Sequence, residues 1–249
     1  MDVEMERNGT GEYAFTIIVP IYNEVENIGR LEEKLQNYLS QSLLPACVLF
    51  VNDGSTDGSG EKIHDICKRN PRFFYLDLKK NGGLSAALKA GIDHCSSQYV
   101  GYMDADMQTD VDDFNLLLPH LSEFELVTGI RANRKDSFFK NFQSKIANGY
   151  RRMMTGDGIA DTGCPLKVMH TAYAKRIPMF NGMHRFLPAL ILLQNGKIQQ
   201  IAVRHYPRMA GKSKYHLWNR LTGPFIDCFA YRWMKKRYIN YQISDSNVN

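Results

Sequence analysis

Short apolar runs and stretches of helical period alternate along the first half of the chain. The runs are rich in β-branched and aromatic residues, and polar, turn-forming segments separate them from the helical stretches. Four strands are therefore predicted, at 15–21, 48–51, 73–78 and 99–103. Apolar positions three and four residues apart predict helices between them, the first two at 28–39 and 61–69. Strands that alternate with helices imply right-handed crossovers, a mainly parallel sheet and the α/β fold class.

The pattern becomes less regular after about residue 126. Strands are predicted at 127–130 and 198–203, while residues 216–241 carry apolar side chains at four-residue steps with basic residues elsewhere. That spacing predicts an amphipathic helix, which Gly223–Pro224 should break or kink. The apolar stripe of this helix fits packing in the core as well as contact with a membrane.

Composition narrows the cell compartment and the kinds of site. Of the 249 residues, 44% are hydrophobic and 23% are charged, which is ordinary for a globular protein. No apolar run reaches the roughly 20 residues of a membrane-spanning helix, and the first residues lack the order of a signal peptide. The five cysteines form no C-x-x-C motif, so reduced thiols are expected rather than disulfides or a zinc site. We therefore expect a cytoplasmic protein.

Positive charge gathers in two segments, although the net charge is only +5. Residues 131–152 contain seven Lys and Arg and one acid, and residues 204–237 contain nine and one. The rest of the chain is acidic. Such clustering predicts an anionic partner, namely phosphate, a membrane surface or nucleic acid, and the alternative is a solvated basic face.

Polar clusters follow three of the predicted strands. They are residues 22–24, 52–55 and 104–106. Because the carboxyl ends of parallel strands border one ligand crevice, Glu24, Asp53, Asp104 and Asp106 should lie together there. A carboxylate pair suits Mg²⁺ or Mn²⁺, and acidic side chains also suit hydrogen bonds to a base or ribose. The sequence has no Walker A motif and no G-x-G-x-x-G after a strand, which argues against P-loop NTPases and dinucleotide oxidoreductases.

Eight motifs carry a family resemblance. VPIYNE, VNDGSTDGS, KKNGGLSAALKAG and YMDADMQTD resemble, in this order, the inverting family 2 glycosyltransferases of the GT-A fold. Further along, VTGIRANR, DTGCPLKVMH, HRFLPALILLQNG and VRHYPRMAGKSKY are similar to the dolichol-phosphate mannose synthase and polyprenyl-phosphate glycosyltransferase group. The resemblance implies a GDP- or UDP-sugar donor, a dolichyl or undecaprenyl phosphate acceptor, and Mg²⁺ or Mn²⁺. It also implies peripheral association with the cytosolic face of a membrane.

Individual residues receive expected roles. The resemblance implies that Asp104, Asp106 and Gln108 bind the metal and that Arg208 and Lys214 hold phosphate and serve catalysis. Contacts to the nucleotide-sugar are expected from Pro20, Tyr22, Glu24, Asp53, Asn81 and Asp104. The acceptor phosphate is expected to bind at Arg131, Arg134, Arg204, Arg208 and Lys214, where positive charge gathers.

Several assignments keep two interpretations. Asp161 is a candidate catalytic residue that orients the acceptor or acts as a base for a hydroxyl acceptor, and its DTG segment also fits a turn cap. Asn81-Gly82-Gly83 fits a turn before the third helix as well as backbone that approaches the ribose. Pro20 is expected to end its strand and to shape the base pocket by position. Surface or core positions are expected for three histidines, His170, His184 and His205.

The expected domain organisation follows the motifs. It comprises an N-terminal extension at 1–14, a GT-A domain at 15–205 with a nucleotide-binding half (15–125) and an acceptor half (126–205), and a basic acceptor-loop and tail segment at 206–249. Two other functions fit the sequence: transfer to a saccharide hydroxyl of a growing polysaccharide, and non-catalytic binding of a nucleotide-sugar or polyanion. Nucleic acid is not expected as a partner, and a homo-oligomer is left open.

Overall fold

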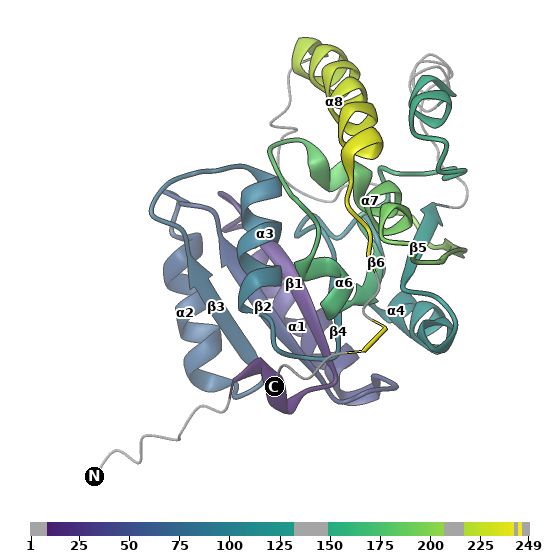
Figure 1. Ribbon diagram of the computed structural model, residues 1–249. Coiled ribbons are helices and arrows are strands. Elements are labelled where there is room, and N and C mark those ends of the chain that lie inside the picture. Colours follow the sequence, from purple (N-terminus) through teal and green to yellow (C-terminus); the bar gives the residue numbers. More distant parts are fainter. Residues whose placement is uncertain (1–8, 132–148, 207–216, 242–243, 246–249) are drawn as a thin grey trace.

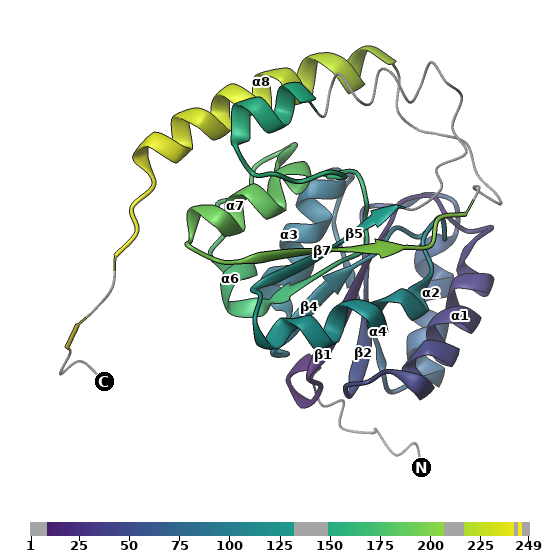
Figure 2. The same cartoon turned by 90° about the vertical axis from the view of Figure 1, so that its right-hand side faces the viewer.

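The computed structural model describes residues 9–131, 149–206, 217–241 and 244–245, with backbone alone at 217–222 and 224. Within these residues one sheet has helices on both faces (Figures 1 and 2). Its strands are β1 (Phe15–Ile21), β2 (Ala46–Asn52), β3 (Phe73–Asp77), β4 (Tyr99–Tyr102), β5 (Leu126–Arg131), β6 (Lys167–His170) and β7 (Ile198–Val203). The α-helices are α1 (Ile28–Gln41), α2 (Ser59–Arg69), α3 (Leu84–His94), α4 (Phe114–Leu117), α6 (Thr171–Lys175), α7 (Leu187–Leu193) and α8 (Leu217–Arg237). The 3-10 helices are η1 (Thr10–Glu12), η2 (Val111–Asp113), η3 (Leu118–Ser122) and η4 (Met183–Phe186).

The strand order is β3-β2-β1-β4-β6-β5-β7. Strands β1 to β4 run parallel, and β5 runs parallel to β7, whereas β6 is antiparallel to both of its neighbours. The predicted α/β class with a mainly parallel sheet is therefore confirmed. Strand β6 was not predicted, because its four residues include a lysine and show no alternation; pairing on both sides makes this segment a strand.

Two apolar layers enclose the sheet, since successive strand residues point to opposite faces. Ile17 and Val19 of β1 pack with α1, α2 and α4, while Ile18 packs with α3, α6, α7 and α8. The predicted stripe of α1 is buried throughout, at Ile28, Leu31, Leu35, Tyr38 and Leu39. With both faces covered, the carboxyl edge of β1, β2 and β4 is where the polar loops meet.

Helix α8 continues through Gly223–Pro224, so the predicted break at this dipeptide is wrong. Its described inner side packs on the body of the protein: Tyr231 is buried, donates its hydroxyl hydrogen to Ala189 O at 3.2 Å and stacks on Phe186. These tertiary contacts offset the backbone hydrogen bond that a proline removes.

The apolar stripe of α8 lies on the opposite side of the helix from Tyr231. Phe225, Phe229 and Trp233 are 49%, 53% and 62% exposed, so they are not part of the core. In Figure 2 this helix runs along the upper edge of the molecule, beside the helical residues 149–155. Among the described helices, none is both long and apolar enough to cross a membrane.

Candidate functional site

The three polar clusters predicted from the sequence meet at one edge of the sheet. Strand β1 lies between β2 and β4, and all three run in the same direction. Asp53 N donates to Ile21 O at 2.8 Å, and Met103 N donates to Ile18 O at 3.2 Å, which ties the three strand ends together. The parallel order of the strands thus brings the acidic segments into one crevice.

The segment after β4 presents oxygen-bearing side chains on one side. Asp104, Asp106 and Gln108 are half-buried, and the apolar residues before and between them are buried. Gln108 N donates to Asp106 Oδ1 at 3.1 Å, and Met107 has a φ of 53°, so the segment turns sharply after the second aspartate. Burial therefore alternates along residues 103–108, with Asp104, Asp106 and Gln108 as the more exposed positions.

This donor set fits a hard divalent cation. It consists of two carboxylates and an amide oxygen, the ligands that Mg²⁺ and Mn²⁺ accept. Within the part of the chain that the structure describes, no three His, Cys, Asp or Glu side chains converge as a closed metal cage. A cation held by Asp104, Asp106 and Gln108 would therefore keep coordination positions for phosphate oxygens.

Asp53 holds the turn that leads into α3. Its two carboxylate oxygens accept from Gly82 N at 2.7 Å and from Gly83 N at 2.8 Å, and Asp53 is buried. The Asn81-Gly82-Gly83 segment is thus a turn before the third helix, as one of its two interpretations had it. Each oxygen of Asp53 keeps a second lone pair, so a contact with the nucleoside stays compatible with this role.

The loop after β1 is fixed by its neighbours. Asn23 has a φ of 51°, and its N–H donates to Ser55 Oγ at 3.0 Å. Glu24 Oε2 accepts from Asn27 Nδ2 at 2.7 Å, just before α1. Tyr22 is half-buried at the same edge. Pro20 does not end its strand, because β1 continues to Ile21 and pairs there with Asn52.

Asp161, which is buried, and Arg131, which is half-buried, form an ion pair. Arg131 Nε and Nη2 each donate to one oxygen of Asp161 at 2.8 Å, and Arg131 N donates to the same carboxylate at 3.2 Å. The side chains are 14% and 10% exposed. Both residues were predicted to act at the acceptor, but not as partners of each other. The fork geometry orients the guanidinium and compensates its charge.

A buried lysine lies near both the acidic segment after β4 and this ion pair. Lys167 is fully buried on β6, opposite Tyr102 of β4, and its Nζ lies 5.5 Å from the centre of the Tyr102 ring. Nζ donates to Cys164 O and, at 3.4 Å, to Thr162 O. Burial lowers the pKa of the Lys167 ammonium. The sequence analysis missed this residue, and its signal was a lysine within an apolar stretch.

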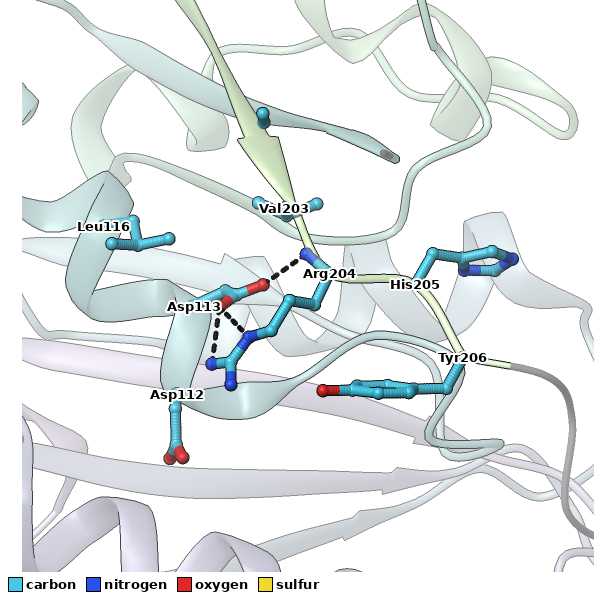
Figure 3. A pocket seen from close by; sticks show the side chains of 8 residues that line it. Asp112, Asp113, Leu116, Val203, Arg204, His205 and Tyr206 are labelled. Atoms are coloured by element: carbon cyan, nitrogen blue, oxygen red, sulfur yellow. Dashed lines mark hydrogen bonds and ion pairs between the residues drawn. The ribbon is translucent and has the colours of Figure 1, made fainter. Parts of the chain in front are cut away.

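Arg204, at the end of β7, is paired with two carboxylates. Its Nε donates to Asp113 Oδ1 at 2.8 Å, and its Nη1 lies 3.1 Å from Asp110 Oδ2. Figure 3 shows Arg204 and Asp113 at a pocket of about 510 Å³, with the hydroxyl end of Tyr206 toward the guanidinium. Because the two carboxylates compensate the charge of Arg204, this predicted acceptor residue has little charge available for a phosphate.

The chain after β7 is hydrogen-bonded to the acidic segment after β4. Tyr206 N donates to Gln108 O at 2.8 Å, and Thr109 pairs with His205 in a β-bridge. The predicted site residues Arg134, Arg208 and Lys214 lie outside the described residues. Of the other histidines, His170 Nε2 bonds to Leu121 O at 2.9 Å, which fits the structural role expected for it.

Comparison with protein families gives one clear match. The family model described as "Glycosyl transferase family 2" covers residues 16–177. This range includes β1 to β6, the acidic segment after β4 and the Arg131–Asp161 pair.

The names of curated proteins with similar sequences refer to polyprenyl phosphates. A dodecaprenyl-phosphate galacturonate synthase from Rhizobium johnstonii is 32% identical over 206 residues, covering 80% of this chain and 61% of that protein. An undecaprenyl-phosphate 4-deoxy-4-formamido-L-arabinose transferase from Serratia proteamaculans is 31% identical over 208 residues, covering 81% of this chain and 63% of that protein. The chain thus spans less than two thirds of the length of these relatives.

Solved structures share the fold at low sequence identity. One is a mannosyltransferase from Pyrobaculum calidifontis in complex with GDP-Man and Mn²⁺, with a TM-score of 0.63 and 18% sequence identity. The superposition covers 92% of this chain and 65% of the mannosyltransferase chain. A glucosyl-3-phosphoglycerate synthase from Mycobacterium tuberculosis, in complex with phosphoglyceric acid, has a TM-score of 0.66 at 12% identity and covers 90% of this chain and 80% of its own.

Proposed function

This chain belongs to glycosyl transferase family 2 and has the GT-A fold, and on that basis we propose that it transfers a sugar from a GDP- or UDP-sugar to a polyprenyl phosphate with Mg²⁺ or Mn²⁺. One observation carries the proposal: the hydrogen bond from Tyr206 N to Gln108 O ties the start of the basic segment to the acidic one. In the sequence, Arg208 follows Tyr206 by two positions. An anionic acceptor and a metal-bound diphosphate would then meet.

The reaction involves two negatively charged groups, the departing diphosphate and the acceptor phosphate. Asp104, Asp106 and Gln108 would hold the metal, which when bound would neutralise the charge that develops on the departing diphosphate. An acceptor phosphate oxygen forms a bond to the anomeric carbon while the bond from that carbon to the diphosphate oxygen breaks. The nucleoside diphosphate leaves with the electron pair, and configuration inverts. Because the acceptor is already an anion at pH 7, no proton has to be removed.

The Arg131–Asp161 pair favours a phosphate acceptor over a saccharide hydroxyl. A hydroxyl acceptor needs a general base within hydrogen-bond reach. Asp161 is the candidate, and both of its oxygens already accept from Arg131. Polyprenyl-phosphate transfer is therefore the function that this geometry supports best.

A substrate screen tests the proposal. GDP- and UDP-sugars would be incubated with undecaprenyl or dolichyl phosphate and Mn²⁺, and released nucleoside diphosphate would be measured. Release that requires the lipid phosphate is expected. Release with oligosaccharides alone would favour the saccharide-acceptor alternative, and no release with any pair would favour a non-catalytic binding protein.

Replacing the basic residues of the RMAGKSKY segment should reduce transfer. Arg208→Ala and Lys214→Ala are each expected to lower kcat/KM for the lipid phosphate by about 10- to 100-fold, the range for hydrogen bonds to charged groups. Steady-state kinetics with varied lipid phosphate would measure this. Lys68→Ala is the matched control, because this exposed lysine of α2 pairs with Asp65 at 3.3 Å. Full activity of both variants would contradict the phosphate acceptor.

The exposed side of α8 is proposed as the surface that meets the membrane. We define this α8 face as Phe225, Ile226, Phe229, Trp233 and the neighbouring Met153, which are 49–72% exposed. Basic residues continue the same helix at Arg232, Lys235, Lys236 and Arg237. Large apolar side chains beside cations match the acyl chains and anionic headgroups of one leaflet.

Membrane binding should depend on the α8 face. Phe229→Ala and Trp233→Ala are each expected to weaken binding to anionic vesicles about 10-fold, since burying such a side chain contributes about 1.5–3 kcal/mol. Vesicle sedimentation at several salt concentrations would measure this, and rising salt should also release the protein. Leu43→Ala is the control, because Leu43 is 59% exposed near the end of α1. Unchanged binding by both aromatic variants would contradict this surface.

A further inference from the structure

A serine and a histidine from distant parts of the chain form a hydrogen-bonded pair beside the crevice. Ser85 lies in the first turn of α3 and is 4% exposed, and its Oγ is 2.7 Å from His184 Nδ1. Gly182 N donates to the same Oγ at 3.1 Å. The pair therefore fixes η4, which carries His184, against the helix that starts at the nucleotide side of the sheet.

Two hydrogen bonds at the Ser85 hydroxyl bear on which nitrogen of the His184 ring carries the proton. The Ser85 hydroxyl accepts from Gly182 N, and among the described residues His184 Nδ1 is the other group bonded to it. If the hydroxyl donates its hydrogen to Nδ1, the ring proton of His184 resides on Nε2, which is the tautomer that the proposal below requires. Burial, together with the charges of Arg185 and Lys167, lowers the pKa of His184 to about 3. The ring stays neutral at physiological pH.

His184 lies among positive charges, although Asp227 acts on one of them, Arg185. Within the described part of the chain no acceptor is bonded to Nε2, and the residue keeps partial exposure. Lys167 and Arg185 are the charged groups that act on the ring, and the N-terminus of α3 adds partial positive charge. A neutral N–H donor among positive charges suits an anionic oxygen better than a sugar hydroxyl.

We propose that His184 donates its Nε2–H to a phosphate oxygen in the crevice, and that Ser85 is the positioning residue that holds the imidazole in this tautomer. The proposal deepens the proposed function and rests on it. Two sources have this chemistry, the diphosphate of the nucleotide-sugar and the phosphate of the polyprenyl acceptor. In either case the bond is charge-assisted at the acceptor, which makes it stronger than a bond between neutral groups.

Binding and kinetics of His184 variants test the proposal. His184→Ala is expected to lower either the affinity for nucleoside diphosphate with Mg²⁺ or kcat/KM for the lipid phosphate by about 10- to 100-fold. A lower affinity for nucleoside diphosphate in calorimetry would show that His184 contacts the donor diphosphate. A decrease confined to kcat/KM for the lipid phosphate would show that it contacts the acceptor. His184→Gln, whose amide is a neutral N–H donor, should recover part of the loss. Ser85→Ala should lower the same affinity or kcat/KM as His184→Ala, but by a smaller factor.

His94→Ala is the matched control, because His94 is exposed at the other end of α3. Thermal melting of each variant separates a structural effect: a loss that follows the melting temperature and is not recovered by His184→Gln would overturn the proposal. Unchanged diphosphate binding together with unchanged lipid-phosphate kinetics in His184→Ala would also overturn it.

Nitrogen NMR of the histidine rings gives a readout that does not require sugar transfer. The His184 signals should show a neutral ring with hydrogen on Nε2, and they should shift on addition of nucleoside diphosphate with Mg²⁺ or of farnesyl phosphate. A neutral ring with hydrogen on Nδ1, or no shift with either ligand, would overturn the proposal. Shifts without any transfer would leave the His184 contact standing and contradict the proposed function instead.

Discussion

Asp106→Asn is expected to remove most metal-dependent turnover, lowering kcat by roughly 10²- to 10³-fold. The substitution keeps the shape of the side chain but removes one of the two carboxylate charges that would hold the cation. Without the cation, the negative charge that develops on the departing diphosphate meets only Asp104 and its remaining neighbours. Asp106 is half-buried at a strand end, so the core and the melting temperature should change little.

Metal titration distinguishes this outcome from a general loss of binding. Calorimetry with Mn²⁺ and nucleoside diphosphate should show metal-dependent binding in the parent and much weaker binding in Asp106→Asn. Asp93→Asn is the control, since this exposed carboxylate of α3 pairs with Lys89. Equal nucleotide affinity with and without metal, in parent and variant alike, would exclude the metal site.

Asp161→Asn is expected to destabilise the fold by about 3–5 kcal/mol, because it leaves the largely buried Arg131 guanidinium without its compensating carboxylate. For a chain of this length the melting temperature should fall by on the order of 10 °C. Arg131→Met should cost a similar amount, and the double variant should cost less than the sum of the two. A double-mutant cycle measured by chemical denaturation gives the coupling.

The same variants separate the two acceptor classes. If the acceptor is a phosphate, activity per folded molecule should fall only modestly in Asp161→Asn, because no proton is removed. A general base would be worth about 10²- to 10⁴-fold, and a loss of that size in fully folded Asp161→Asn would favour a hydroxyl acceptor. Melting temperatures near those of the parent would contradict the structural part of this prediction.

Local patterns in the sequence determined the nucleotide-binding half of the sheet. Short apolar runs and helical stripes depend on neighbouring residues, so β1 to β4 and the buried face of α1 could be predicted directly. Once parallel order is implied, the carboxyl ends must meet, which places Asp53, Asp104 and Asp106 in one crevice. Motif spacing added the family resemblance, and the family match agrees with it.

The tertiary structure alone decided how the remaining charges are used. Arg131 pairs with Asp161 across 30 positions, Arg204 with Asp113 across 91, and Ser85 with His184 across 99. Such pairs depend on strand order and register, which no local window contains. The unpredicted antiparallel β6 sets that order, because it brings Lys167 beside β4 and places β5 and β7 at the sheet's far edge. Burial then makes each charged group take a partner, since an unpaired charge away from water is costly.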